Sequence, residues 1–287
     1  LKRFAFKMYV FARLSARHGY LHGASVRKPS LAWMVRPRGL VTAQSPKPMK
    51  RFYKAAGVER CSDEGSWRVV LDGRPVKTPK GSLLQLPTRA VAVDVAEEWE
   101  AQTEHVRPLE MPLTTLSCTA VDLIRPQLAS GTCVDRLLPF LETDTVCFDD
   151  ENELLAARQE AEWGPLRAWF EAHLGVKLAV TRGFVAAAHP EETMARVRSE
   201  LLGRNEWDLC AIEVATSTAK SLIVATALVD RPDTEAEDAL RWALLEEHFQ
   251  IERWGLVEGE HDVSHEEALR WFAAVRRFAR KCASKAE

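Results

Sequence analysis

Residues 240–262 read LRWALLEEHFQIERWGLVEGEHD, and the first part of this stretch predicts a helix that organises the C-terminal half of the chain. At about 100° per residue, its apolar side chains fall on two stripes. The first stripe contains Leu240, Leu244, Ile251 and Trp254, and the second contains Trp242, Leu245 and Phe249. A helix that is apolar on two sides is expected to pack between other elements rather than on a surface.

Acidic and polar residues interrupt this apolar pattern. Glu247 falls inside the first stripe, where a carboxylate is costly unless it is paired or serves a function. Glu246, Gln250 and Arg253 form a polar strip beside it, and Gly255 predicts the end of the helix. The residues leave open whether Glu247 forms a structural ion pair, with Arg253 or with a lysine of another helix, or contacts a partner.

The first 48 residues predict a mitochondrial transit peptide. Residues 1–58 contain 13 Lys or Arg and no Asp or Glu. Transit peptides are typically rich in Arg and Ser, poor in acidic residues and amphipathic, as residues 4–10 are. A disordered basic tail that binds acidic surfaces is the alternative. We expect the mature protein to start near residues 39–49 and to lie in the mitochondrial matrix.

The remainder of the chain is acidic, with 26 basic and 41 acidic residues. This balance argues against nucleic acid as a partner. The apolar runs are too short to cross a bilayer, so we expect no insertion into a membrane. The six cysteines lack the C-x-x-C spacing of zinc and redox sites, and we expect them to be reduced thiols.

The pattern predicts an α+β fold with two domains after the leader at 1–48. A small β-rich domain is expected at 49–128, and a mostly helical domain at 129–287. The strands predicted in the first domain are 51–54, 67–71 and 82–86. Asp72-Gly73 is a strong signal for a hairpin turn. Thr88 is then expected to cap a helix in which Trp99 shares one face with Val91 and Val95.

Helical periodicity continues through the second domain. The predicted helices are 131–142, 152–173, 191–203, 207–228, 234–254 and 265–282. Pro165 is expected to break or kink the second of them. Two capping-box spacings predict helix starts, Thr234 with Glu237 and Ser264 with Glu267.

Two pairs of residues would suit a hydrolase, but each lacks its usual context. Ser217 and Lys220 have the S-x-x-K spacing of serine acyl enzymes without the accompanying S-D-N motif or a complete K-T-G motif. His261 and His265 have the spacing of zinc ligands in H-E-x-x-H, although a helix start at Ser264 would break that geometry. We therefore predict no catalytic residue, metal or cofactor, and keep a serine- or metal-dependent hydrolase as the alternative.

Seven motifs between residues 50 and 262 occur in a consistent order. They are RFYK (51–54), LDGRPVKTP (71–79), EEWEAQ (97–102), MPLTTLSCTAVD (111–122), FLETDTVCF (140–148), EWGPL (162–166) and LLEEHFQIERWG (244–255). Together they resemble the mitochondrial ATP synthase F1 complex assembly factor 2 family, the chaperones of the F1 alpha subunit. The chain departs from the family pattern at Gly164, where members often carry Asp.

The resemblance implies a binding protein rather than an enzyme. Such chaperones bind the free alpha subunit, cover the surface that later meets beta subunits, and leave as the ring forms. An obligate ring subunit exposes a large apolar interface before assembly, and such a patch aggregates. The resemblance also places Glu247 at the acidic position of the family's most characteristic motif. We predict a monomer that binds the alpha subunit through Glu247, Glu246, Gln250, Arg253 and Trp254.

Overall fold

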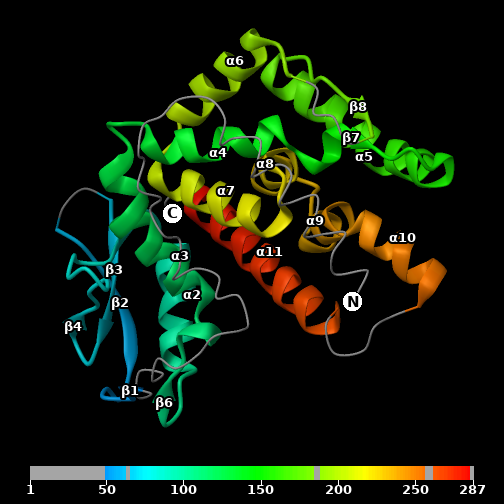
Figure 1. The fold of residues 1–287 in the computed structure, drawn as a ribbon. Helices are drawn as coiled ribbons and strands as arrows, with labels where there is room; N and C mark the ends of the chain where they lie inside the picture. Colours follow the sequence, from blue (N-terminus) through cyan, green and yellow to red (C-terminus); the bar gives the residue numbers. More distant parts are fainter. Residues whose placement is uncertain (1–48, 63–64, 184–187, 256–260, 285–287) are drawn as a thin grey trace, which may run out of the picture. The chain divides into compact units, whose positions relative to one another are not determined.

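A small antiparallel sheet opens the described part of the chain, which in this computed structural model comprises residues 49–62, 65–183, 188–255 and 261–284 (Figure 1). Its central strand, β3 (Trp67–Leu71), pairs antiparallel with β2 (Ala56–Arg60), β4 (Arg74–Pro75) and β5 (Gln85–Leu86). Asp72 and Gly73 form the predicted turn between β3 and β4, with φ angles of 48° and 77°. Positive φ at both central residues is the geometry that a tight two-residue hairpin requires.

α2 (Arg89–Glu100) packs on this sheet and begins where the sequence predicted. The hydroxyl oxygen of Thr88 accepts a hydrogen bond from the Val91 amide at 3.2 Å and caps the helix. Val91 and Val95 are fully buried, whereas Trp99 is half-buried against the ring of Tyr53. β1 (Met49–Lys50) and β6 (His105–Val106) form a separate antiparallel pair.

Helices dominate the rest of the described chain, which confirms the predicted α+β class. They are α3 (Pro112–Thr119), α4 (Thr132–Glu142), α5 (Glu153–Leu174), α6 (Glu191–Leu202), α7 (Glu206–Ala219), α8 (Leu222–Asp230), α9 (Ala236–Ala243), α10 (Leu245–Trp254) and α11 (His261–Ala283). Short helical turns are η1 (Pro108–Glu110), the π-helical η2 (Ala120–Ile124), η3 (Arg125–Gln127) and η4 (Thr145–Cys147). β7 (Phe148–Asp149) and β8 (Thr181–Arg182) pair in parallel. No helix within the described ranges is both long and apolar enough to span a bilayer.

The last helix, α11, connects the β-rich and helical regions. It packs against α7, α8 and α9 and also against α2 and α3, a path that Figure 1 shows. Phe272, Val275 and Phe278 on α11 are fully buried. The described residues from Met49 onward belong to one compact unit. The division into two domains at residue 128 stays a prediction.

The predictions for three elements are wrong in their extent. Residues 51–54 form no strand, because β1 ends at Lys50 and β2 starts only at Ala56. The helix predicted at 207–228 is two helices, since Lys220 adopts a left-handed conformation (φ 57°) and ends α7. The helix predicted at 234–254 is also two, because the backbone leaves the helical region at Leu244 (φ −110°, ψ 15°).

Three local signals in the helical region were also misleading. α5 continues unbroken through Pro165, between the fully buried Trp163 and Leu166. The capping box of α9 uses Glu235 and Asp238, one residue beyond the predicted pair. α11 begins at His261, so Ser264 does not start the helix. Buried packing around Pro165, and a neighbouring pair of side chains at α9, outweigh the local pattern.

Candidate functional site

α10 carries most of the last family motif and is attached to α5 by polar contacts. The Glu246 Oε1 atom accepts a hydrogen bond from the Gln159 Nε2 atom at 2.9 Å. Six residues further along α10, Glu252 forms a 2.6 Å ion pair with Arg158, and the two side chains are 59% and 38% exposed. The hydrogen bond from Arg158 also lowers the pKa of the Glu252 carboxyl. An exposed ion pair of this kind contributes about 0–1 kcal/mol, so the Arg158–Glu252 pair adds little to the attachment of α10.

Glu247 is directed toward α11 instead. Its Oε1 atom lies 2.9 Å from the Nε2 atom of His265, and the two side chains are 15% and 20% exposed. The ring of His248 meets the His265 ring edge to face, with 5.3 Å between the ring centres. Burial and the neighbouring His265 lower the pKa of His248. Glu247 is thus paired with a residue of another helix, as one of the structural alternatives predicted, but the partner is a histidine and not a lysine. Its functional role stays a prediction.

The outer face of α10 is exposed, and the prediction that this helix packs on two sides is wrong. Leu245 is the only buried residue of α10. Ile251 and Phe249 are half-buried, and Gln250 and Trp254 are exposed, Trp254 by 58%. The break at Leu244 explains the difference, because the two predicted stripes assumed one continuous helix. A short helix with so little burial is not stable by itself and depends on its neighbours.

Arg253 also lies on the exposed outer face. Its guanidinium carbon stands 4.6 Å from the centre of the Phe249 ring, a cation–π distance. Of the five residues predicted to bind a partner, Gln250, Arg253 and Trp254 therefore face solvent. Glu246 and Glu247 are half-buried and hold α10 in place.

The polar residues of the other motifs have partners inside the fold. Arg51 donates to the backbone oxygens of Glu100 (2.9 Å) and Lys54 (2.7 Å). It thereby supplies positive charge at the C-terminal end of α2, where the helix dipole favours it. The hydroxyl of Thr78 donates to the Asp122 carboxylate at 2.6 Å, which connects the segment after β4 to η2.

Two motif carboxylates cap helices that are distant in sequence. The oxygens of Glu98 accept from the backbone amides of Leu113 and Thr114, both at 2.7 Å, at the start of α3. Asp144, which is fully buried, accepts from the amide of Ile223 at 3.0 Å at the start of α8. Burial raises the pKa of Asp144 to about 7, although several hydrogen bonds oppose the shift. We call Arg51, Thr78, Glu98, Asp122 and Asp144 the internal motif residues.

The Glu160 carboxylate occupies the space that a side chain at position 164 would need. A Cβ atom at Gly164 would stand 2.6 Å from Glu160 Oε1. Glu160 reaches across this space to pair with Arg167, whose guanidinium is buried and also donates to Asp149 at 3.0 Å. A side chain at position 164 would therefore have to displace the Glu160 carboxylate.

The geometry of the two hydrolase pairs differs from that of an active site. Lys220 Nζ donates to the backbone oxygen of Ser217 at 2.5 Å, not to its hydroxyl. His261 and His265 do share one helix, contrary to the expected break at Ser264, but the His265 imidazole pairs with Glu247. The side chain of His261 lies outside the described residues. Within the described ranges no three His, Cys, Asp or Glu side chains are grouped as a metal site would require.

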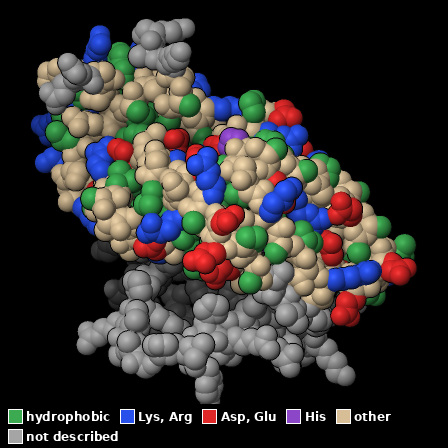
Figure 2. Space-filling view, turned by 90° about the horizontal axis from the view of Figure 1, so that it is seen from above, with side chains coloured by type: hydrophobic (Ala, Val, Ile, Leu, Met, Phe, Trp, Pro, Cys, Tyr) green, Lys and Arg blue, Asp and Glu red, His purple; other side chains and the backbone are tan. Residues whose placement is uncertain are grey.

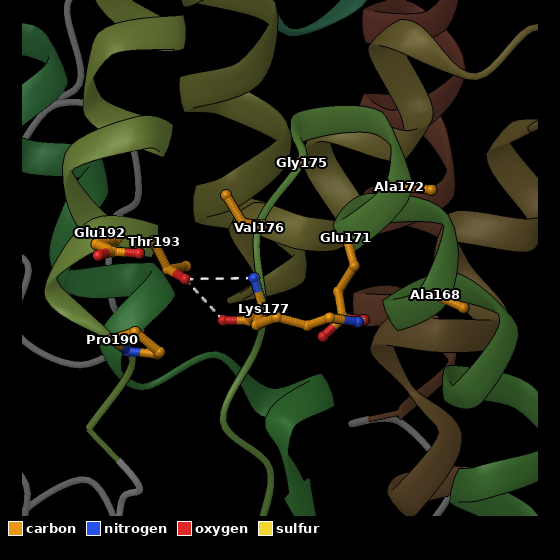
Figure 3. A pocket seen from close by; sticks show the side chains of 9 residues that line it. All are labelled: Ala168, Glu171, Ala172, Gly175, Val176, Lys177, Pro190, Glu192 and Thr193. Atoms are coloured by element: carbon orange, nitrogen blue, oxygen red, sulfur yellow. Dashed lines mark hydrogen bonds and ion pairs between the residues drawn. The ribbon is translucent and has the colours of Figure 1, made fainter.

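An open cleft of about 650 Å³ lies between the C-terminal end of α5 and the start of α6 (Figure 3). Its polar side chains already pair with one another. Thr193 Oγ1 donates to the backbone oxygen of Lys177 at 2.7 Å, and Lys177 Nζ pairs with Glu171 at 3.0 Å. The face in Figure 2 likewise shows basic and acidic side chains interspersed. These surfaces offer no charge of one sign that would select a ligand.

Comparison with known proteins gives consistent matches. A family model described as ATP12 chaperone protein matches residues 50–171, a range that ends inside α5. Protein atp12, mitochondrial, of Schizosaccharomyces pombe is 31% identical over 239 residues, which cover 78% of this chain and 81% of the relative. Protein ATP12, mitochondrial, of Saccharomyces cerevisiae is 24% identical over 265 residues, or 78% and 82%. The crystal structure of Atp12 from Paracoccus denitrificans superposes with a TM-score of 0.75 at 30% identity, covering 82% of this chain and 98% of that one.

Proposed function

Because this chain belongs to the ATP12 family of ATP synthase assembly chaperones, we propose that it binds the free alpha subunit of F1-ATP synthase. It covers the surface that later meets the beta subunit and so promotes assembly of the alpha/beta ring. We propose further that it acts by binding alone, without catalysis, and that it does so as a monomer. The single observation that supports a binding role best is the exposed outer face of α10.

This face has the composition of a binding surface. α10 ends in an indole that is 58% exposed, next to an exposed guanidinium and an exposed amide. Trp and Arg are the residues most often found at the energetic centre of protein interfaces. An exposed aromatic side chain at the end of a helix can cover apolar surface on a client.

The small size of α10 also suits a temporary complex. The chaperone must leave when the beta subunit arrives, so its own interface has to be weaker than the permanent one. α10 offers one short helix, while permanent subunit interfaces bury about 2,000 Å² or more. The small contact is consistent with displacement by the true partner.

We propose that the protein works in the mitochondrial matrix. Both fungal relatives carry the word mitochondrial in their names. The acid-free leader at residues 1–48, which lies outside the described residues, has the composition of a transit peptide.

Co-expression tests the proposal directly. The alpha subunit is produced with and without this chain, and the amount of alpha subunit in the soluble fraction is measured. We expect the chain to raise that amount and to elute with the alpha subunit in gel filtration. The beta subunit expressed alone serves as the control client. An unchanged soluble fraction of the alpha subunit, or equal effects on both subunits, would contradict the proposal.

A further inference from the structure

The two ends of α10 differ in how their polar side chains are used. The carboxylates of Glu246 and Glu247 accept hydrogen bonds from α5 and α11, so they do not face solvent as an interface acid would. The C-terminal end carries Gln250, Arg253 and Trp254, all exposed, together with the exposed Glu252, which is paired with Arg158. A partner that approaches this end of α10 from solvent therefore meets a cation, an amide and an indole, and the exposed Glu252 carboxylate there already has a partner.

Arg253 is well prepared for such a contact. Among the described residues its guanidinium has no carboxylate partner, whereas the neighbouring Glu252 is paired with Arg158. The Phe249 ring lies 4.6 Å from the guanidinium carbon, and Phe249 itself packs against the core. Stacking on a half-buried ring restricts the side chain while leaving its N–H groups available. A planar guanidinium with available N–H groups matches a carboxylate in two parallel hydrogen bonds.

Trp254 supplies the apolar part of the same surface. It is the last residue of α10 and follows Arg253 directly, so the two side chains leave the helix end together. An indole buries a large area when it enters a recess, and a rim of polar contacts around it excludes water. The contact thus combines one apolar anchor with one charged hydrogen-bond donor.

We infer that Arg253 and Trp254 form the contact point of α10, and that the group they bind on the alpha subunit is a carboxylate beside an apolar recess. This inference rests on the proposed function. It reverses the simplest interpretation of the motif, in which the two glutamates accept hydrogen bonds from the client. Glu246 and Glu247 are positioning residues that hold α10 against α5 and α11.

The test is the affinity of the full chain for the alpha subunit, measured with purified proteins. We expect Arg253→Glu and Trp254→Ala each to weaken binding by about 30-fold, the size of an interface hot spot. Arg253→Lys should lose most of that affinity as well, because an ammonium cannot make the paired hydrogen bonds. Rising salt should weaken the unsubstituted chain more than Arg253→Gln.

Matched controls carry the same changes at exposed positions of the β-rich region. Arg107→Glu reverses the charge of a side chain that is 63% exposed, and Phe52→Ala removes an aromatic ring from a residue that is 65% exposed. Both should bind within about twofold of the unsubstituted chain, and all variants should melt within about 2 °C of it.

Four outcomes would overturn the inference. Variants at Arg253 and Trp254 that bind as well as the controls would show that α10 makes no such contact. Tighter binding by Arg253→Glu would show that the partner group is cationic. A collapsed melting temperature would make these residues part of the fold. Failure of the unsubstituted chain to bind the alpha subunit at all would instead contradict the proposed function, and with it the inference.

Discussion

The internal motif residues and the residues of α10 both belong to motifs typical of the family, but their side chains have different roles. Arg51, Glu98 and Asp144 each satisfy backbone groups within the fold, across separations of 49, 15 and 79 residues. α10 buries one residue and exposes its outer face. The contrast shows that a motif typical of the family can either connect distant parts of the fold or form an exposed surface. Burial and hydrogen-bond partners distinguish the two kinds of residue. Changes at the first kind should lower stability, and changes at the second should lower binding.

Asp144 should give the largest effect, and the effect should depend on pH. Its folded-state pKa of about 7 lies above the usual value of 3.8 for the unfolded chain. The folded state therefore binds the proton more tightly, so the contribution of Asp144 to stability is greatest at low pH and falls as pH rises from about 4 to 7. A shift of this size corresponds to about 4 kcal/mol.

Asp144→Asn removes this titration. We expect the free energy of unfolding of the unsubstituted protein to fall more steeply between pH 5 and pH 8 than that of the variant, as measured by urea denaturation. Asp135→Asn, at an exposed position on α4, provides the control and should keep the original slope. Parallel pH profiles for Asp144→Asn and the unsubstituted protein would show that Asp144 does not titrate in this range.

Trp99→Ala should give the next largest loss of stability. Trp99 packs against the core, and its ring lies 5.7 Å from that of Tyr53. The Tyr53 hydroxyl also donates to the backbone oxygen of Trp99 at 2.6 Å. Because the side chain is half-buried, we expect a loss of about 2–4 kcal/mol in thermal or urea unfolding. Phe52→Ala, its exposed neighbour, should change stability by less than about 0.5 kcal/mol. Similar losses of stability in Trp99→Ala and Phe52→Ala would contradict the prediction that the more buried ring contributes more.

Glu247→Gln should have the smallest effect on stability and a clear effect on function. The glutamine keeps the volume and can still accept a hydrogen bond from His265, so we expect a loss below about 1 kcal/mol. The weaker bond should loosen α10 and reduce the amount of alpha subunit that co-purifies with the chain. The measurements are the melting temperature and the co-purified alpha subunit. Normal co-purification would remove Glu247 from the functional site, and a collapsed melting temperature would make it a fold residue.

Local chemistry made much of the fold predictable from the sequence. The turn at Asp72-Gly73 and the cap at Thr88 depend on neighbouring residues alone, and both form as expected. The break at Leu244 did not follow from the sequence, because the local pattern allows one continuous helix over 234–254. The same holds for the Asp144 cap, whose partner Ile223 is 79 residues away.

The sequence singles out residues 244–255, and the structure shows that the C-terminal end of α10 is exposed. That this surface binds a partner stays a prediction. Which side chains of α10 face outward depends on Gln159 and His265, the partners of Glu246 and Glu247. Neither pairing can be predicted from residue spacing, so only the structure shows which side chains of α10 are exposed.

The position of α11 has a consequence for the order in which the chain folds during synthesis. Its buried residues Phe272 and Phe278 complete a core that begins with the first strands, and Thr88 Oγ1 donates to the backbone oxygen of Lys281 at 2.7 Å. The strands β2 to β5 are therefore synthesised long before the helix that completes their core. Until residue 281 is available, the nascent chain exposes apolar core side chains that Phe272 and Phe278 later cover, and such exposed surface is prone to aggregation.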